Sequence, residues 1–277
     1  MKLTTTQIKK FQIKIWDYYQ THGRDFIWRK KITPYYVVVS EIMLQQTQTK
    51  RVAEKFPKFI KQFPNFKSLA KASPSAVILA WQGLGYNRRA LFLRELAKKV
   101  MAECKGKLPQ NPAELITLPG IGKNTAGSVS AFAFNTPTVF IETNIRAVYL
   151  REFFPNQTEV PDAKLIPLIE TTVAKENPRE WYYALMDYGV MLKKTYSNPS
   201  RASQHHHKQS TFKGSRRAVR GELLRVLAKK PATLRELQRS VSLFDPTYTT
   251  TTQEILITLC AEGFIEKVKA SYQLKHA

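Results

Sequence analysis

Apolar residues recur at the spacing of an α-helix up to about residue 195, and short breakers separate the helical segments. The first segment has its apolar residues at Ile8, Phe11, Ile15, Trp16 and Tyr19 and ends before Gly23. Later breakers are Pro64, Ser73-Pro74, Gly83-Leu84-Gly85, Lys105-Gly106 and Pro119-Gly120-Ile121-Gly122. No convincing alternation of polar and apolar residues, the pattern typical of a strand, precedes residue 260. The pattern predicts a mainly α fold with short connections.

The charge of the chain points to a polyanionic partner. Lys and Arg number 44 against 21 Asp and Glu, which gives a formal net charge of +23 over 277 residues. With 43% hydrophobic residues, the chain can bury a core in one large domain or a few small ones, so collagen-like, mucin-like and largely disordered folds are excluded. Nucleic acid is the first candidate partner for a protein this basic.

Neither a membrane nor a cysteine-ligated metal is expected. No apolar run approaches the roughly 18 residues of a spanning helix, and residues 1–6 do not open the apolar segment of a signal peptide. The two cysteines, Cys104 and Cys260, cannot form a disulfide framework or a four-cysteine site. We expect a cytoplasmic protein, associated with the nucleoid if the source is bacterial.

The composition changes after Leu192. No acidic residue lies between Asp187 and Glu222. Basic residues accumulate over this stretch at Lys193, Lys194, Arg201, Lys208, Lys213, Arg216, Arg217 and Arg220. This is the composition of a solvated connector. Beyond it, helices are predicted over 221–227, 234–241 and 249–261, and a hairpin over 264–268 and 272–274, which is the order of a winged helix. The alternative is a small packing or partner-binding module.

The segment 118–126 contains a tight turn between two helical segments. Gly120 and Gly122 let the backbone expose bare N–H groups where the second helix starts, and such a turn can hold a phosphate. A plain interhelical turn has the same pattern, but the basic charge of the chain favours phosphate. Lys123, Asn124 and Thr125 then lie in the first turn of that helix.

Two glutamates follow apolar residues. Glu41 lies within the apolar helical segment 37–44, where an unpaired carboxylate is costly. It is either a structural acid bonded to neighbouring N–H groups or a proton donor whose pKa burial has raised. Glu142 lies where a helix starts, so it serves either the chemistry or the helix N-terminus. The polar groups that follow Glu41 suit base edges or a gap in a strand; they belong to Gln45, Gln46 and Thr47.

Six blocks in order carry a resemblance to a known family. They are Arg24-Asp25-Phe26-Ile27-Trp28-Arg29, Pro34-Tyr35, Ser40-Glu41-Ile42-Met43-Leu44-Gln45-Gln46-Thr47-Gln48, Gly83-Leu84-Gly85-Tyr86, Leu118-Pro119-Gly120-Ile121-Gly122 and Ala184-Leu185-Met186-Asp187-Tyr188-Gly189. Together the blocks closely resemble the adenine DNA glycosylases of the MutY type, within the helix-hairpin-helix glycosylase superfamily. The likeness covers about residues 7–200, and the block that begins at Ser40 is the most diagnostic.

The resemblance implies two helical domains with DNA across the cleft between them. A six-helix domain over about 27–136 holds the hairpin, residues 1–26 with 137–215 form the second domain, and 216–277 is the winged-helix-like module. Glu41 matches the family's proton donor, and Gln46 and Tyr86 would fill or wedge the duplex where the base leaves. The adenine pocket would be lined by Arg24, Phe26, Trp28 and Asp187. Catalysis would also use Glu142 and Asn144, and further DNA contacts would come from Gln45, Thr47, Arg88, Gly120, Gly122, Lys123, Asn124 and Thr125.

The chemistry fits this family independently. Adenine leaves poorly as an anion, so cleavage of its N-glycosidic bond benefits from protonation at a ring nitrogen while the sugar gains oxocarbenium character. One acid and one carboxylate anion suffice for this. The base must first be flipped out, and an aromatic residue such as Tyr86 can stack into the gap it leaves.

The chain departs from the family pattern at four places. Asn124 stands where bifunctional relatives have a Schiff-base lysine, so a monofunctional enzyme is expected. Glu142 replaces the family's catalytic aspartate and is one methylene longer. The C-terminal module does not resemble the Nudix-like domain through which many relatives read 8-oxoguanine opposite the adenine. The four iron-sulfur cysteines of the family are replaced by Lys193, Ser200, Ser203 and Gln209. No cluster and no other cofactor is therefore expected, the basic connector would take over its phosphate contacts, and residues 205–207 are a solvated histidine tract rather than a metal site.

Three functions remain open. The leading hypothesis is a monofunctional, cluster-less adenine DNA glycosylase of base excision repair, acting as a monomer on adenine paired with 8-oxoguanine or guanine in double-stranded DNA. The second is a mismatch glycosylase of the same fold for thymine, uracil or hypoxanthine. Glu41 favours a purine as the base, because pyrimidine anions leave more readily without an acid. The third is a non-catalytic DNA-binding or regulatory protein.

Overall fold

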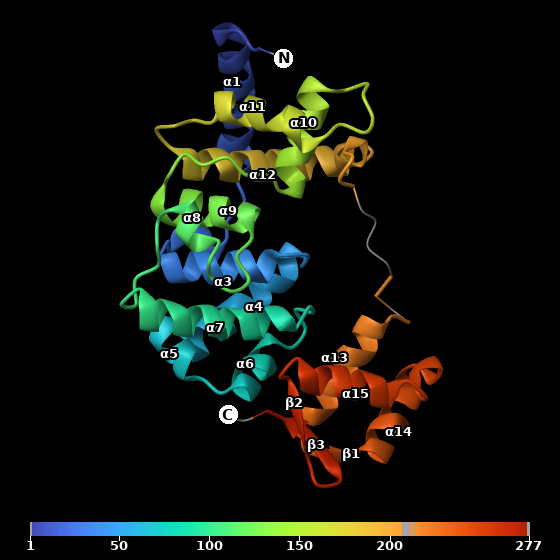
Figure 1. Cartoon of the computed structure of the whole chain (residues 1–277). Helices are drawn as coiled ribbons and strands as arrows, with labels where there is room; N and C mark the ends of the chain where they lie inside the picture. Colours follow the sequence, from blue (N-terminus) through green and yellow to red (C-terminus); the bar gives the residue numbers. More distant parts are fainter. Residues whose placement is uncertain (1, 207–210, 213, 276–277) are drawn as a thin grey trace. The chain divides into compact units, whose positions relative to one another are not determined.

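The chain is mainly α-helical, as its apolar periodicity predicts (Figure 1). A computed structural model describes residues 2–206, 211–212 and 214–275. It forms two compact units, of which the first comprises Met1–Glu41 and Leu108–Lys208 and the second Ile42–Lys107 and Gln209–Ala277. These units group the residues differently from the domains implied by the resemblance, which stay a prediction. Among the described helices, none is long and apolar enough to cross a membrane.

The first unit is built from long amphipathic helices and several short ones. They are α1 (Thr5–His22), α2 (Ile27–Lys30), α3 (Pro34–Leu44), whose last turn passes into the second unit, α8 (Pro112–Leu115), α9 (Lys123–Phe134), α10 (Thr143–Phe153), α11 (Asp162–Thr172), α12 (Pro178–Thr195) and the 3₁₀ turn η1 (Pro199–Ala202). A capping box formed by Thr4 and Gln7 starts α1, because each side chain satisfies a backbone N–H of the other. Phe11 of α1 packs on Tyr149 and Trp181, with ring centroids 5.5 and 5.8 Å away. This aromatic cluster joins α1, α10 and α12.

The second unit begins with the last turn of α3 and four further helices. These are α4 (Thr49–Gln62), α5 (Phe66–Lys71), α6 (Pro74–Trp81) and α7 (Arg88–Glu103). The apolar stripe of α4 is buried at Val52, Phe56, Phe59 and Ile60, while its opposite face is polar. Asn65 and Ser73 cap α5 and α6 through their side-chain oxygens, so the predicted breakers are helix starts.

The C-terminal part of the second unit has its own apolar core. Its elements are α13 (Arg216–Leu227), β1 (Ala232–Thr233), α14 (Leu234–Phe244), η2 (Pro246–Tyr248), α15 (Thr252–Ala261), β2 (Ile265–Val268) and β3 (Ser271–Leu274). The strands pair antiparallel in the order β1-β3-β2, with Ile265 opposite Leu274 and Ala232 opposite Tyr272. The predicted three helices and hairpin are present, and β1 adds a third strand. The first helix begins at Arg216 rather than at 221, because the Ser215 side chain accepts a hydrogen bond from the Ala218 N–H.

Candidate active site

Glu41 lies in α3 among buried neighbours. Val38, Val39 and Ile42 have no exposed surface, while Glu41 itself is partly buried. Burial raises the pKa of Glu41 to about 7, a hydrogen bond with the Ser128 hydroxyl opposes the rise, and the charge of Glu142 adds to it. A carboxyl with this pKa is protonated in about half of the molecules at neutral pH. Of the two interpretations of Glu41, these properties favour the proton donor.

Glu142 caps the N-terminus of α10. Its Oε1 accepts hydrogen bonds from the backbone N–H groups of Asn144, at 2.9 Å, and Ile145, at 3.2 Å. Its Oε2 accepts a third from the Asn144 side-chain amide, also at 3.2 Å. Three donors therefore orient one carboxylate, and the helix terminus favours its negative charge. The Asn144 Oδ1 atom is buried and has no hydrogen-bond partner among the described residues.

The hairpin turn precedes α9 as predicted. Gly120 has φ +79°, a left-handed conformation that glycine adopts without strain, and a side chain built on Gly122 would meet open space. Gly122, Lys123 and Asn124 are exposed, so the first turn of α9 is accessible to a ligand. The Asn124 Oδ1 accepts a hydrogen bond from the Ile141 N–H at 3.2 Å, which ties α9 to the segment that carries Glu142.

The four residues expected to line a base pocket come together around a buried ion cluster. Asp187 of α12 accepts from the Arg24 backbone N–H and from Arg24 Nε, both at 2.7 Å. The rings of Phe26 and Trp28 stack with centroids 4.7 Å apart, and the Arg24 guanidinium lies 5.3 Å from the Phe26 centroid. Arg29, which the sequence did not single out, donates two further hydrogen bonds to Asp187, at 2.8 and 2.9 Å. Asp187 thus holds two arginines rather than presenting a free oxygen.

Residues at the cluster-cysteine positions do not fit an iron-sulfur cluster. Such clusters need thiolate ligands, and Lys193, Ser200 and Ser203 supply none. The fourth position, Gln209, lies outside the described residues, as do Lys208, Lys213 and His207. The described part of the chain has no group of three or more His, Cys, Asp or Glu residues that could hold a metal, and His205 and His206 are exposed.

Lys193 instead faces the charges of the candidate site. Burial lowers the pKa of its ammonium group, the charge of Glu142 opposes this change, and Arg24 adds to it. Gly189, one helical turn earlier in α12, comes so close to α10 that a Cβ atom there would lie 2.4 Å from the Asn144 carbonyl oxygen. Because residues four apart share a helix face, Lys193 lies on the side of α12 that packs against α10.

In the second unit, the residues expected to wedge the duplex have strained backbones. Gln46 has φ +51° and Tyr86 has φ +45°, left-handed values that cost a residue other than glycine on the order of 1 kcal/mol. Both side chains are exposed. The surrounding structure must enforce such strain, and strained residues are common at functional sites.

Arg89, which was not predicted from the sequence, links the two segments that carry Gln46 and Tyr86, here called the wedge segments. Its buried guanidinium donates to the carbonyls of Ile42, Met43 and Gln45 at the end of α3, at 2.6 to 3.0 Å. It also donates to Thr47 Oγ1 and to the carbonyls of the 83–86 segment, at Leu84 and Gly85. Burial lowers the pKa of Arg89 to about 10, which leaves it charged at neutral pH.

Comparison with known proteins identifies the family of the chain. Residues 39–166 match the family described as HhH-GPD superfamily base excision DNA repair protein. The chain is 36% identical to the adenine DNA glycosylase of Buchnera aphidicola subsp. Baizongia pistaciae over 66% of its own length and 52% of the relative's. It is 28% identical to the adenine DNA glycosylase of Mycolicibacterium smegmatis over 92% of both chains.

A solved structure extends the likeness to the fold. A thermostable thymine-DNA glycosylase is 30% identical to the chain, with a TM-score of 0.63 over 69% of this chain and 89% of that one. The chain spans about half the length of the Buchnera relatives that it matches. The matched segment, the shared fold and the identity to these relatives show that the chain belongs to the helix-hairpin-helix superfamily of base excision DNA repair proteins.

Proposed function

We propose that the protein is a monofunctional adenine DNA glycosylase that removes adenine mispaired with 8-oxoguanine or guanine. The observation that carries the proposal is the pKa of Glu41, which burial raises to about 7, beside a second carboxylate, Glu142, that is fixed by three hydrogen bonds. The names of the curated relatives support adenine as the base.

In this proposal the two carboxylates have opposite roles. Protonated Glu41 donates its proton to a ring nitrogen of the flipped adenine, so that the base leaves as a neutral molecule. Ionised Glu142 stabilises the positive charge that develops on the sugar. Asn144 orients the Glu142 carboxylate through its side-chain amide. Because no amine stands at position 124, the product is an intact abasic site.

Double-stranded DNA is the proposed partner, and a monomer without a cofactor is the proposed active form. The net charge of +23 supports attraction to a polyanion, and the accessible first turn of α9 supports a phosphate contact through backbone N–H groups. Gln46 and Tyr86 are suited to hold the duplex open, since the aromatic ring can replace the stacking that the flipped base loses.

A second candidate is removal of thymine from a G·T mispair. The solved thymine-DNA glycosylase at 30% identity favours it. A pyrimidine anion leaves more readily than an adenine anion, so an acid with a raised pKa is less needed there. The raised pKa of Glu41 therefore favours adenine over thymine as the base that is removed.

A panel of duplexes with defined mispairs tests the proposal. The duplexes carry adenine opposite 8-oxoguanine, guanine or thymine, and thymine, uracil or hypoxanthine in the matching mispairs, and excision is measured under single-turnover conditions. We expect release of adenine from the first two duplexes only. Excision of thymine without adenine would establish the second candidate, and no excision from any duplex would contradict both.

A further inference from the structure

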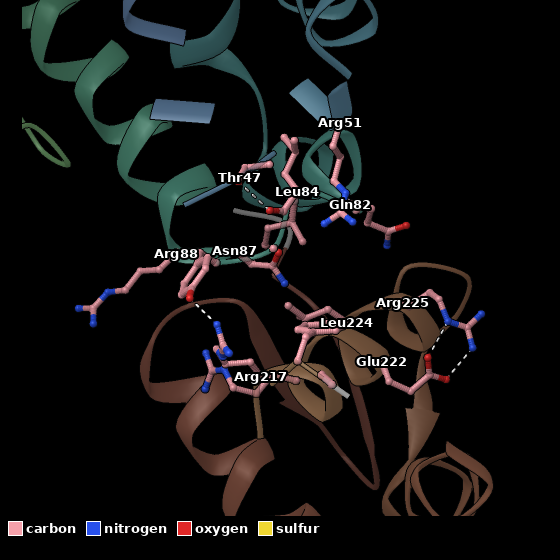
Figure 2. A pocket seen from close by; sticks show the side chains of 18 of the residues that line it. Thr47, Arg51, Gln82, Leu84, Asn87, Arg88, Arg217, Glu222, Leu224 and Arg225 are labelled. Carbon is pink, nitrogen blue, oxygen red and sulfur yellow. Dashed lines mark hydrogen bonds and ion pairs between the residues drawn. The ribbon is translucent and has the colours of Figure 1, made fainter. Parts of the chain in front are cut away.

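A cleft of about 1010 Å³ lies within the second unit (Figure 2). One wall comes from the start of α4 and the 82–88 segment, and the other comes from α13 of the C-terminal part. Figure 2 shows Arg51 and Arg88 on the first wall and Arg217, Leu224 and Arg225 on the second. The cleft therefore brings the wedge segments together with a module that the resemblance does not explain.

The lining is strongly cationic. Its ionisable Lys, Arg, Asp and Glu residues are Arg51, Lys55, Arg88, Arg217, Arg220, Arg225 and a single acid, Glu222. Arg225 is neutralised by Glu222 at 2.6 Å, and Arg220 by Glu262 at 2.6 Å. Arg51, Lys55 and Arg88 form no ion pair with any residue that the structure describes. A concave surface with several uncompensated cations attracts a polyanion.

Two of these cations pack against neighbouring residues. The Lys55 side chain lies against Gly83, since a Cβ on that glycine would lie 3.2 Å from Lys55 Cε and 3.5 Å from Nζ. The Arg88 guanidinium lies 5.2 Å from the centroid of the Phe92 ring, one helical turn further along α7. Such packing reduces the side-chain entropy that a phosphate contact has to overcome.

Tyr86 links the two walls. The Arg217 guanidinium donates a hydrogen bond to the Tyr86 hydroxyl and lies 5.3 Å from the centroid of the Tyr86 ring. The Arg89 guanidinium also lies near this ring, 5.6 Å from the same centroid. The wedge tyrosine, whose φ is left-handed, is thus contacted by an arginine from the C-terminal part.

The C-terminal part is joined to the glycosylase helices through its core. Ile78 of α6 is 2% exposed and belongs to the same apolar cluster as Leu223 and Leu224 of α13. In addition, the Ser75 N–H donates to the Lys275 carbonyl at 3.1 Å. The walls of the cleft are therefore fixed within one compact unit rather than joined by a flexible tether.

We propose that this cleft receives the phosphate backbone of duplex DNA beside the wedge, with Arg51, Lys55 and Arg88 as the phosphate contacts. The inference rests on the proposed function, because it takes duplex DNA as the substrate. An acidic protein segment would also suit the charge, but Gln46 and Tyr86 line the same cleft, which favours DNA. The cleft then contributes to affinity on any sequence, since phosphate contacts carry no base information.

The test measures the affinity of the full chain for an undamaged duplex as a function of salt. The cleft variant combines Arg51→Gln, Lys55→Gln and Arg88→Gln. The control variant combines Lys61→Gln, Lys67→Gln and Lys71→Gln, which remove the same charge from exposed lysines of the same unit that do not line the cleft. A third variant, Arg51→Lys with Lys55→Arg and Arg88→Lys, keeps the charge and checks that packing alone is not responsible.

We expect the cleft variant to bind about 10-fold or more weakly at low salt and the slope of log Kd against log salt to fall by about 2 to 3. The control and the charge-conserving variants should stay within about 3-fold of the wild type. Equal affinities and slopes for the cleft and control variants would overturn the inference. The cleft would then either bind nothing or bind a protein segment. Excision of adenine by the wild-type chain is scored separately, so failure of the proposed function is distinguishable from failure of this inference.

Discussion

Both terminal nitrogens of the Arg29 guanidinium donate hydrogen bonds to the Asp187 carboxylate, Nη1 to Oδ2 at 2.8 Å and Nη2 to Oδ1 at 2.9 Å. The Asp187 side chain has no exposed surface. Arg24 donates to the same two oxygens, so one buried anion holds two cations. The Arg29 charge also acts on Glu41, where it opposes the rise in pKa that burial causes. The pair therefore joins the proposed base pocket to the proposed acid.

Removal of the Asp187 charge should destabilise the fold. Asp187→Asn leaves the buried Arg29 guanidinium and the partly exposed Arg24 guanidinium without an anion, and we expect the free energy of unfolding to fall by about 3 kcal/mol in urea titrations. The control is Asp25→Asn, whose partner Lys30 is exposed, and it should cost less than about 1 kcal/mol. Equal losses for the two variants would mean that the buried cluster adds nothing to stability.

Substitution of Glu142 can separate the catalytic role of its negative charge from its role as a helix cap. Glu142→Gln keeps an oxygen that can accept from the Asn144 and Ile145 N–H groups, so the fold should lose no more than about 1 kcal/mol. Because the negative charge is gone, we expect single-turnover excision to fall by at least about 100-fold. Glu142→Asp should also retain little activity, since its shorter side chain withdraws the carboxylate by about 1.5 Å. Full activity of Glu142→Gln, with folding checked by circular dichroism, would leave Glu142 as a helix cap only.

Asn124 leads to a prediction about the product. Its amide cannot form a Schiff base, and its Oδ1 already accepts from Ile141. The reaction should leave an intact abasic site, with strand breaks only after alkali treatment. Borohydride trapping of a covalent complex between protein and DNA would contradict this, and Lys193 would be the first residue to substitute, because burial lowers the pKa of its amine.

The purified protein should contain no iron and show no broad absorption in the visible. The reason is that none of the four cluster positions carries a cysteine. Elemental analysis of protein expressed with excess iron and sulfide checks this. One cluster per chain would require ligands that the family pattern does not contain.

The helices and the hairpin could be predicted because local patterns encode them. Apolar periodicity, capping residues and the glycines at 120 and 122 act within a few residues of the chain, and so does the placement of Glu41 in an apolar helix. The start of α13 was missed because one serine, Ser215, caps a helix inside a stretch whose composition is that of a solvated connector.

Arg29 and Arg89 could not be assigned in the same way. Asp187, the partner of Arg29, is 158 residues away in sequence, and nothing local indicates which of many arginines reaches it. Arg89 binds mainly backbone carbonyls, which every residue has, so its acceptors leave no trace in the sequence. Its place inside a helix that starts at the wedge segment was the one available signal.

The most direct test of acid catalysis by Glu41 is single-turnover excision of adenine opposite 8-oxoguanine, measured against pH for the wild type and for Glu41→Gln. The protonated form of Glu41 predominates below its pKa of about 7 and declines tenfold per pH unit above it. The wild-type rate should therefore fall as pH rises through about 7. Glu41→Gln should be slower by at least about 100-fold at pH 6, lack this titration, and bind the mismatched duplex as the wild type does. Near-normal excision by Glu41→Gln with an unchanged pH profile would contradict the account.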